Sequence, residues 1–138
     1  MSQIEISDDV SRHDEAALED AINRYNFETT NIRDGRRLSI IIRSRAGDLE
    51  AGLSGHTWGG VCEVKLLWVE ESRRRSGLGR RLLQAAAAEA RGRGCVKMVL
   101  CTHSFQAPDF YQRQGFKQSG SFSDYPSGHD QLFLEKTL

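Results

Sequence analysis

The segment LLWVEESRRRSGLGRRLLQAAAAEARGRG, residues 66–94, joins an apolar run to an alanine-rich helical pattern through a turn crowded with arginine and glycine. The first backbone N–H groups of a helix have no partner inside it, and the helix dipole is positive at that end. Gly77 and Gly79 lack a Cβ, so an anion can approach the backbone closely. Charge-assisted hydrogen bonds to the anion are expected from Arg74, Arg75 and Arg80. The segment therefore predicts a strand–turn–helix unit that binds phosphate or pyrophosphate.

Two common phosphate-binding motifs fit this turn poorly. A P-loop requires a lysine followed by serine or threonine after its last glycine, and the segment has no such pair. A dinucleotide-binding fingerprint requires a third glycine, and Leu82 occupies that position. A solvated arginine cluster whose glycines merely shape a turn is the competing interpretation.

Length and charge narrow the class of protein. The chain has 138 residues, which predicts a single domain over residues 1–138. Lys plus Arg and Asp plus Glu number 19 each, and this balance weighs against a nucleic-acid partner. No apolar run approaches the roughly 20 residues that span a bilayer, so no membrane partner is expected. The acidic N-terminus resembles neither a signal nor a transit peptide, which predicts a cytoplasmic protein.

The three cysteines predict neither a disulfide framework nor a metal site, because Cys62, Cys95 and Cys101 lack paired spacing. Cys62 and Cys101 lie in apolar runs, where a free cysteine behaves as a small hydrophobic residue. We therefore expect both to be buried and inert.

Hydrophobic periodicity alternates between helical and extended patterns along the chain. Helices are expected over about residues 14–27, 78–91 and within 107–116, and strands over 38–45, 49–58, 61–69, 95–102, 115–122 and 130–138, with 3–7 as a short first strand. In the strand 61–69, the even positions Cys62, Val64, Leu66 and Trp68 are apolar and are expected to face the core throughout. The order predicts an α/β (α+β) fold, with a mixed central sheet of about six to seven strands flanked by helices on both faces.

Two motifs resemble those of the GCN5-related N-acetyltransferase (GNAT) family. RRSGLG, residues 74–79, resembles its R/Q-x-x-G-x-G/A motif, and APDFYQRQGF, residues 107–116, resembles a helix that carries F-Y-x-x-x-G-F. The separation of the motifs also fits, and the resemblance covers residues 38–138. The tail resembles that of a prokaryotic subgroup of small-molecule type. Arg74 replaces a frequent glutamine, and VEES stands where many relatives have proline.

The resemblance implies acetyl-coenzyme A as the acyl donor and a primary amine as the acceptor. The turn would hold the pyrophosphate, and the pantetheine arm would pair with the strand end where two strands splay apart. A backbone N–H near Val69 would polarise the thioester carbonyl. The implied cofactor-binding residues are Leu67, Trp68, Val69, Arg74, Arg75, Ser76, Gly77, Leu78, Gly79, Arg80 and, more weakly, Phe105.

The resemblance places Tyr111 at the family's general acid, because a phenol is protonated at neutral pH and can donate to the leaving sulfur. A core aromatic is the alternative. Glu63, on the polar side of its strand, is the candidate base, and a solvent-facing residue is an equal alternative. Other candidates for the acceptor pocket are His56, Trp58, His103, Tyr125 and His129.

Three functions remain in competition at this stage. The first is an N-acetyltransferase in which a small-molecule amine attacks the bound thioester directly. The second is a non-catalytic acyl-coenzyme A-binding sensor, and the third is a nucleic-acid binder that uses the arginine-rich turn. Family members are often dimers, so a homodimer through the last strands is one expectation. An ordinary edge strand guarded by Lys136 is the other.

Overall fold

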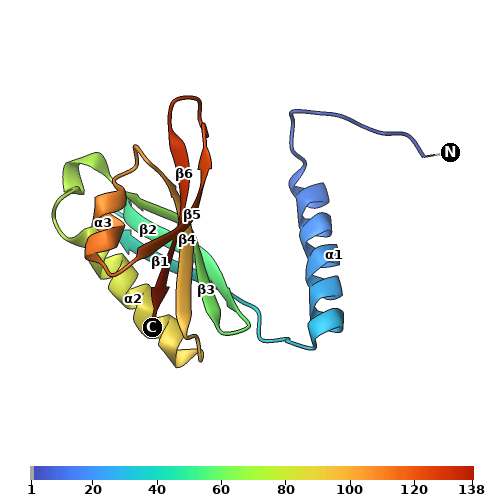
Figure 1. The fold of residues 1–138 in the computed structure, drawn as a ribbon, viewed down its shortest axis with the longest axis horizontal. Coiled ribbons are helices and arrows are strands. Elements are labelled where there is room, and N and C mark those ends of the chain that lie inside the picture. Colours follow the sequence, from blue (N-terminus) through green and yellow to red (C-terminus); the bar gives the residue numbers. More distant parts are fainter. Residues whose placement is uncertain (1) are drawn as a thin grey trace. The chain divides into compact units, whose positions relative to one another are not determined.

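The computed structural model describes residues 2–138 and shows three α-helices and six strands among them (Figure 1). In chain order the elements are α1 (Arg12–Thr30), β1 (Arg36–Arg43), β2 (Leu49–Trp58), β3 (Val61–Val69), a 3₁₀ turn (Glu71–Arg73), α2 (Leu78–Gly92), β4 (Lys97–His103), α3 (Pro108–Arg113), β5 (Lys117–Ser123) and β6 (Asp130–Thr137). Within the described residues, no helix combines the length and apolar character needed to cross a membrane.

The chain forms two compact units, Met1–Arg33 and Asp34–Leu138. The first contains α1, which is capped by Ser11 and has no buried residue. The expected short strand over residues 3–7 is wrong, because the described part of this segment is irregular and exposes Ile4 and Ile6 almost fully. Two apolar residues without a neighbouring strand are too few to hold a strand in place. A single domain over residues 1–138 stays a prediction.

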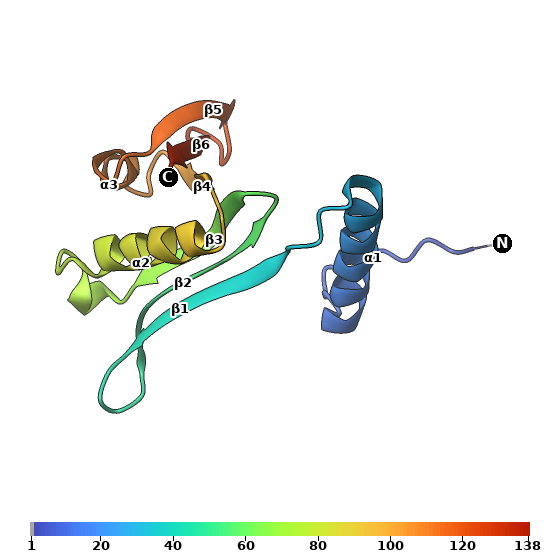
Figure 2. The same cartoon turned by 90° about the horizontal axis from the view of Figure 1, so that it is seen from below.

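The second unit is built on a six-stranded sheet in the order β1-β2-β3-β4-β6-β5. β3 and β4 pair in parallel, whereas the other neighbouring strands pair antiparallel. A parallel pair needs a crossover, and α2 supplies it by running along one face of β1–β3 (Figure 2). The predicted mixed sheet and α+β class are confirmed, and a helix over the opposite face stays a prediction.

The core lies between α2 and the sheet face that it covers. Its largest fully buried side chains are Leu53, Leu82, Met98, Leu134 and Cys62. α3 joins the same core through Phe110 and Tyr111, which pack against it while remaining partly exposed. The core therefore fixes α2 and α3 against the same side of the sheet, and so fixes the turn that precedes α2.

A β-bulge interrupts the pairing of β2 with β3. Ser54 pairs with Leu66 but Gly55 pairs with Val64, so Lys65 is an extra residue on β3. A bulge reverses the alternation of faces. The expectation that Leu66 and Trp68 face the core is therefore wrong: they are 69% and 44% exposed, while Leu67 and Val69 pack against the core.

We expect Gly55→Ala to disrupt this bulge, because a Cβ at Gly55 would lie 2.0 Å from the carbonyl oxygen of Glu63. Backbone must move to relieve such a clash, so the free energy of unfolding should fall by about 1–3 kcal/mol or more. Gly52→Ala on the same strand is the control, since its nearest contact is the movable side chain of Ile41 at 3.1 Å. Urea unfolding of both variants measures the difference, and equal losses would contradict the prediction.

Candidate active site

β3 and β4 stop pairing with each other about halfway along their length. Their register runs from Val61 opposite Lys97 to Val64 opposite Leu100 and stops there. Beyond that point β3 continues to Val69 beside β2, and β4 continues to His103 beside β6. The backbone groups that face each other across the two strand ends therefore form no hydrogen bonds with each other. Because backbone N–H and C=O groups need hydrogen bonds, the gap suits an extended ligand that pairs like a strand.

The N-terminus of α2 has no side-chain cap and no acidic residue in its first turn. Instead it carries Arg80 and Arg81, cations at the positive end of the dipole. α1 in the same chain shows the ordinary arrangement, with Ser11 accepting from the N–H of Asp14 at 3.3 Å and two acidic residues in the first turn. The first N–H groups of α2 therefore remain for an anion, which would also neutralise the arginines.

The turn before α2 is shaped by two residues in the left-handed region, Arg75 with φ 62° and Gly77 with φ 87°. A left-handed non-glycine residue costs about 1–2 kcal/mol, and such strain tends to occur at functional sites. Arg74 ties the turn to the end of β3, because its Nε donates to the carbonyl oxygen of Val69 at 3.0 Å. Ser76 also donates to the carbonyl oxygen of Arg73. The bond from Arg74 thus joins the turn directly to the end of β3, and the bond from Ser76 holds the turn itself.

Tyr111 lies on α3 between two phenylalanines, with ring centroids 5.1 Å from Phe110 and 5.9 Å from Phe116. Burial raises the pKa of its phenol. Phe110 in turn fills the space over Gly79, where an added Cβ would lie 3.0 Å from its ring. α3 is therefore seated on the first turn of α2 through Phe110, and Tyr111 is the residue next to this contact.

Glu63 pairs across strands with His56, whose Nδ1 lies 3.7 Å from a carboxylate oxygen. Both side chains are partly exposed, on the sheet face opposite α2. Glu63 belongs to the last residue pair but one before β3 and β4 stop pairing. The bulge brings Leu66 and Trp68 to the same face as Glu63, so a carboxylate and two apolar side chains line one strip of β3.

The predicted residues are brought together only in part. Leu67, Val69, Ser76, Gly77, Leu78 and Gly79 lie along one path from the strand gap to the start of α2. Trp68 contributes backbone to this path, but its side chain points to the other face. Arg75 and Arg80 are exposed at the turn. Phe105 lies instead in the loop after β4, stacked on His103 at 5.4 Å.

The expectation for the cysteines was half right. Cys62 and Cys95 are buried, and burial raises the pKa of the Cys62 thiol to about 11. Cys101 is exposed, contrary to expectation, because its alternation on β4 directs it away from α2. Partial desolvation of the sulfur, and after it the charge of Glu63, raise the pKa of the Cys101 thiol. The raised pKa lowers the fraction of reactive thiolate. Within residues 2–138 no group of three or more His, Cys, Asp or Glu is placed to hold a metal ion.

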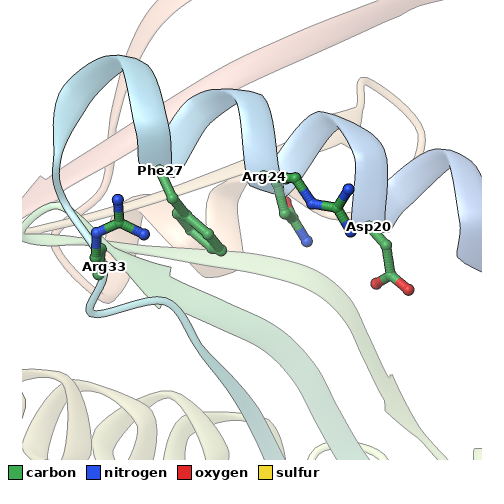
Figure 3. A pocket seen from close by; sticks show the side chains of 5 residues that line it. Asp20, Arg24, Phe27 and Arg33 are labelled. Carbon is green, nitrogen blue, oxygen red and sulfur yellow. The ribbon is translucent and has the colours of Figure 1, made fainter.

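Two surface hollows involve none of the predicted site residues. One is lined by Asp20, Asn23, Arg24, Phe27 and Arg33 of the first unit (Figure 3). The other is lined by Gly115, Lys117, Glu135, Lys136 and Thr137. Neither hollow therefore marks the candidate site.

Sequence reasoning missed three features of the site. These are the bulge at Lys65, the bond from Arg74 to the end of β3, and the stacking of His103 with Phe105. The bulge had a detectable signal, since Gly55 interrupts a strand pattern, and such a glycine often marks a bulge or a close backbone approach. The other two are side-chain contacts at the ends of β3 and β4, and neither follows from the hydrophobic pattern.

Comparison with known proteins identifies the family. The model of the acetyltransferase (GNAT) domain matches residues 37–118. The chain belongs to the GNAT family. An acetyltransferase of Agrobacterium fabrum is 37% identical over 131 residues, which cover 95% of this chain and 96% of that protein. A blasticidin-S acetyltransferase of Streptomyces morookaense is 44% identical over 93 residues, 67% of this chain and 68% of that protein.

A solved structure extends the likeness to the whole fold. The crystal structure of an acetyltransferase from Bacillus cereus superposes with a TM-score of 0.79 at 29% identity, covering 97% of this chain and 98% of that one. The protein is accordingly an acetyltransferase of the GNAT type. Residues 37–118, which the family model matches, contain both the strand gap and the turn before α2.

We expect Gly77→Asp in this GNAT protein to weaken acetyl-coenzyme A binding at least about tenfold. The new carboxylate would repel the donor's pyrophosphate at the helix N-terminus. Gly47→Asp is the matched control, because Gly47 has φ 90° against 87° for Gly77 and neither has an atom within 4 Å of an added Cβ. Calorimetry measures both Kd values, and equal weakening would show that strain and not charge causes the loss.

Proposed function

We propose that the protein transfers an acetyl group from acetyl-coenzyme A to a primary amine of a small molecule, by direct attack in a ternary complex. The observation that carries the proposal is the uncapped N-terminus of α2, joined through Arg74 to the strand gap. One surface thus offers an anion site and, next to it, strand edges without partners. A thioester with a pyrophosphate at one end and an amide-rich arm at the other suits both.

The chain's residues fit this donor in two ways. The N–H groups at the start of α2, with Arg75 and Arg80 exposed nearby, supply donors and positive charge for the pyrophosphate. The backbone of Leu67–Val69 supplies strand-like hydrogen bonds for the arm. A backbone N–H near Val69 would then face the thioester carbonyl and stabilise negative charge on its oxygen. Phe105 remains a candidate for the lower part of the arm.

The chemistry requires two proton transfers. The amine nitrogen bonds to the thioester carbonyl carbon and the C–S bond breaks. The proton lost by nitrogen passes to the carboxylate of Glu63, which lies on the face opposite α2. The hydroxyl of Tyr111 gives its proton to the departing sulfur, and its raised pKa keeps that proton in place until the sulfur leaves. No covalent acyl-enzyme is needed.

The acceptor is proposed to be a small amine. The blasticidin-S acetyltransferase relative is named for an antibiotic, which supports a small molecule over a protein terminus. The alternative function is an acyl-coenzyme A sensor without turnover, and the retained Tyr111 in its aromatic setting favours the enzyme. The cytoplasmic location and the homodimer expected from the sequence stay predictions.

Replacing Tyr111 with phenylalanine tests the enzyme against the sensor. Removal of a general acid should lower kcat by about 100-fold or more, while the Kd for acetyl-coenzyme A stays within about twofold because the ring is kept. Tyr25→Phe in α1 is the control for loss of a hydroxyl. Steady-state thiol release and calorimetry give the two readouts. Unchanged kcat would remove Tyr111 from the mechanism.

The pH profile tests the proton assignments. Burial raises the pKa of Tyr111 above the ordinary tyrosine pKa of about 10, so the phenol stays neutral throughout the neutral range. We therefore expect kcat not to fall between about pH 7 and pH 9. In Glu63→Gln the amine must lose its proton to water first, so the variant's rate should rise about tenfold per pH unit below the amine's pKa. The gap between variant and wild type should narrow as pH rises. A constant ratio across this range would exclude Glu63 as the base.

A further inference from the structure

Four rings form a connected cluster beside the end of β4. His103 is the last residue of β4, Phe105 belongs to the segment that follows it, and Tyr125 and His129 belong to the loop between β5 and β6. We call these four residues the ring cluster. Phe105 stacks on His103 at 5.4 Å and 9°, Tyr125 lies 5.3 Å from His103, and His129 meets the edge of Phe105 at 5.0 Å.

Hydrogen bonds hold the two loops of the ring cluster together. The ring Nδ1 of His103 lies 2.9 Å from the carbonyl oxygen of Tyr125. The N–H of Ser104 donates to the carbonyl oxygen of Asp130 at 2.8 Å, and the N–H of Asp130 donates back to the hydroxyl of Ser104 at 3.0 Å. These bonds fix the backbone beneath the rings, so the rings are ordered before any ligand arrives.

The ring cluster is ordered without being buried. Phe105 is 55% exposed and Tyr125 is 54% exposed, so each contributes little to the core. Adjacent, ordered and exposed aromatic faces are characteristic of ligand surfaces, since they provide contact area with little loss of side-chain entropy. The ring cluster begins at His103, three residues after Leu100, the last residue of β4 that pairs with β3. It therefore lies at the β4 end of the strand gap, beside the place where the thioester is proposed to react.

We propose that the ring cluster stacks on a planar ring of the acceptor, and that the acceptor is therefore an amine carried by an aromatic or heteroaromatic group. The inference rests on the proposed function and specifies its acceptor. Such an amine would place its ring on Phe105 and Tyr125, and its nitrogen toward the thioester and Glu63. A stacking contact of this kind is worth on the order of several-fold to tenfold in affinity.

The test compares two amines with the same carbon skeleton, 2-phenylethylamine with a planar aromatic ring and 2-cyclohexylethylamine with a saturated, non-planar ring. Calorimetry with coenzyme A present measures the Kd of each, and steady-state kinetics measure kcat/KM. The wild type should favour the phenyl compound by about tenfold in both. Phe105→Leu keeps apolar volume but removes the aromatic face, and Tyr125→Ala removes the second ring. Each should reduce the preference several-fold, and Tyr125→Ala, which lies outside the proposed donor site, should leave the Kd for acetyl-coenzyme A unchanged.

Phe122→Ala is the matched control, because Phe122 is also 55% exposed but contacts Phe133 at 4.9 Å and not the ring cluster. Its preference should equal that of the wild type. A wild-type preference near one, or an equal preference in Phe105→Leu and Tyr125→Ala, would overturn the proposal. Absence of acetyl-coenzyme A binding or of turnover would instead defeat the proposed function. The ring cluster would still be judged on the two amine Kd values, measured without coenzyme A if it does not bind.

Discussion

The structure depends on backbone groups that the fold itself leaves without partners. β3 and β4 pair over four residues and then continue beside other neighbours. A sheet normally avoids this, since each exposed strand edge gives up ladder hydrogen bonds. Here the cost is borne at the point where the bulge at Lys65 redirects β3 and where Gly55 lets the two backbones approach. The strand gap is thus a consequence of how the sheet is paired.

The turn after β3 extends the same logic from strands to a helix. α2 starts without a cap and with arginines at its positive end, an arrangement that lowers stability unless an anion is present. The bond from Arg74 to the carbonyl oxygen of Val69 makes the two unsatisfied regions one unit. Occupation of the turn by an anion would therefore reinforce the strand end at which the thioester is proposed to react. The zero net charge of the chain agrees with this picture, since the positive charge is concentrated locally.

The sequence predicted those parts of the fold that depend on local patterns. The strands around the β1–β2 turn, the bounds of β3 and the start of α2 at Leu78 all follow from periodicity and turn residues, and the structure agrees. The side chains of Leu66 and Cys101 were misassigned for different reasons. The bulge reversed the sheet face on which Leu66 lies. Cys101 faces away from α2, on a strand whose sequence is apolar on both faces. The site roles of Glu63 and Tyr111 follow from family resemblance and remain proposals.

The proposed donor site lies on elements that pack in the core, whereas the proposed acceptor site lies on loops. This difference explains why the sequence predicts the donor more specifically than the acceptor. Donor binding is proposed to use backbone at the end of β3 and the start of α2, and the packing of Leu78, Leu82 and Phe110 fixes both. Acceptor binding is proposed to use side chains on two loops, where Phe105 and Tyr125 contribute almost nothing to the core. Loop side chains can change without unfolding the protein. The rings proposed to bind the acceptor can therefore change while the strand gap and the turn before α2 are kept.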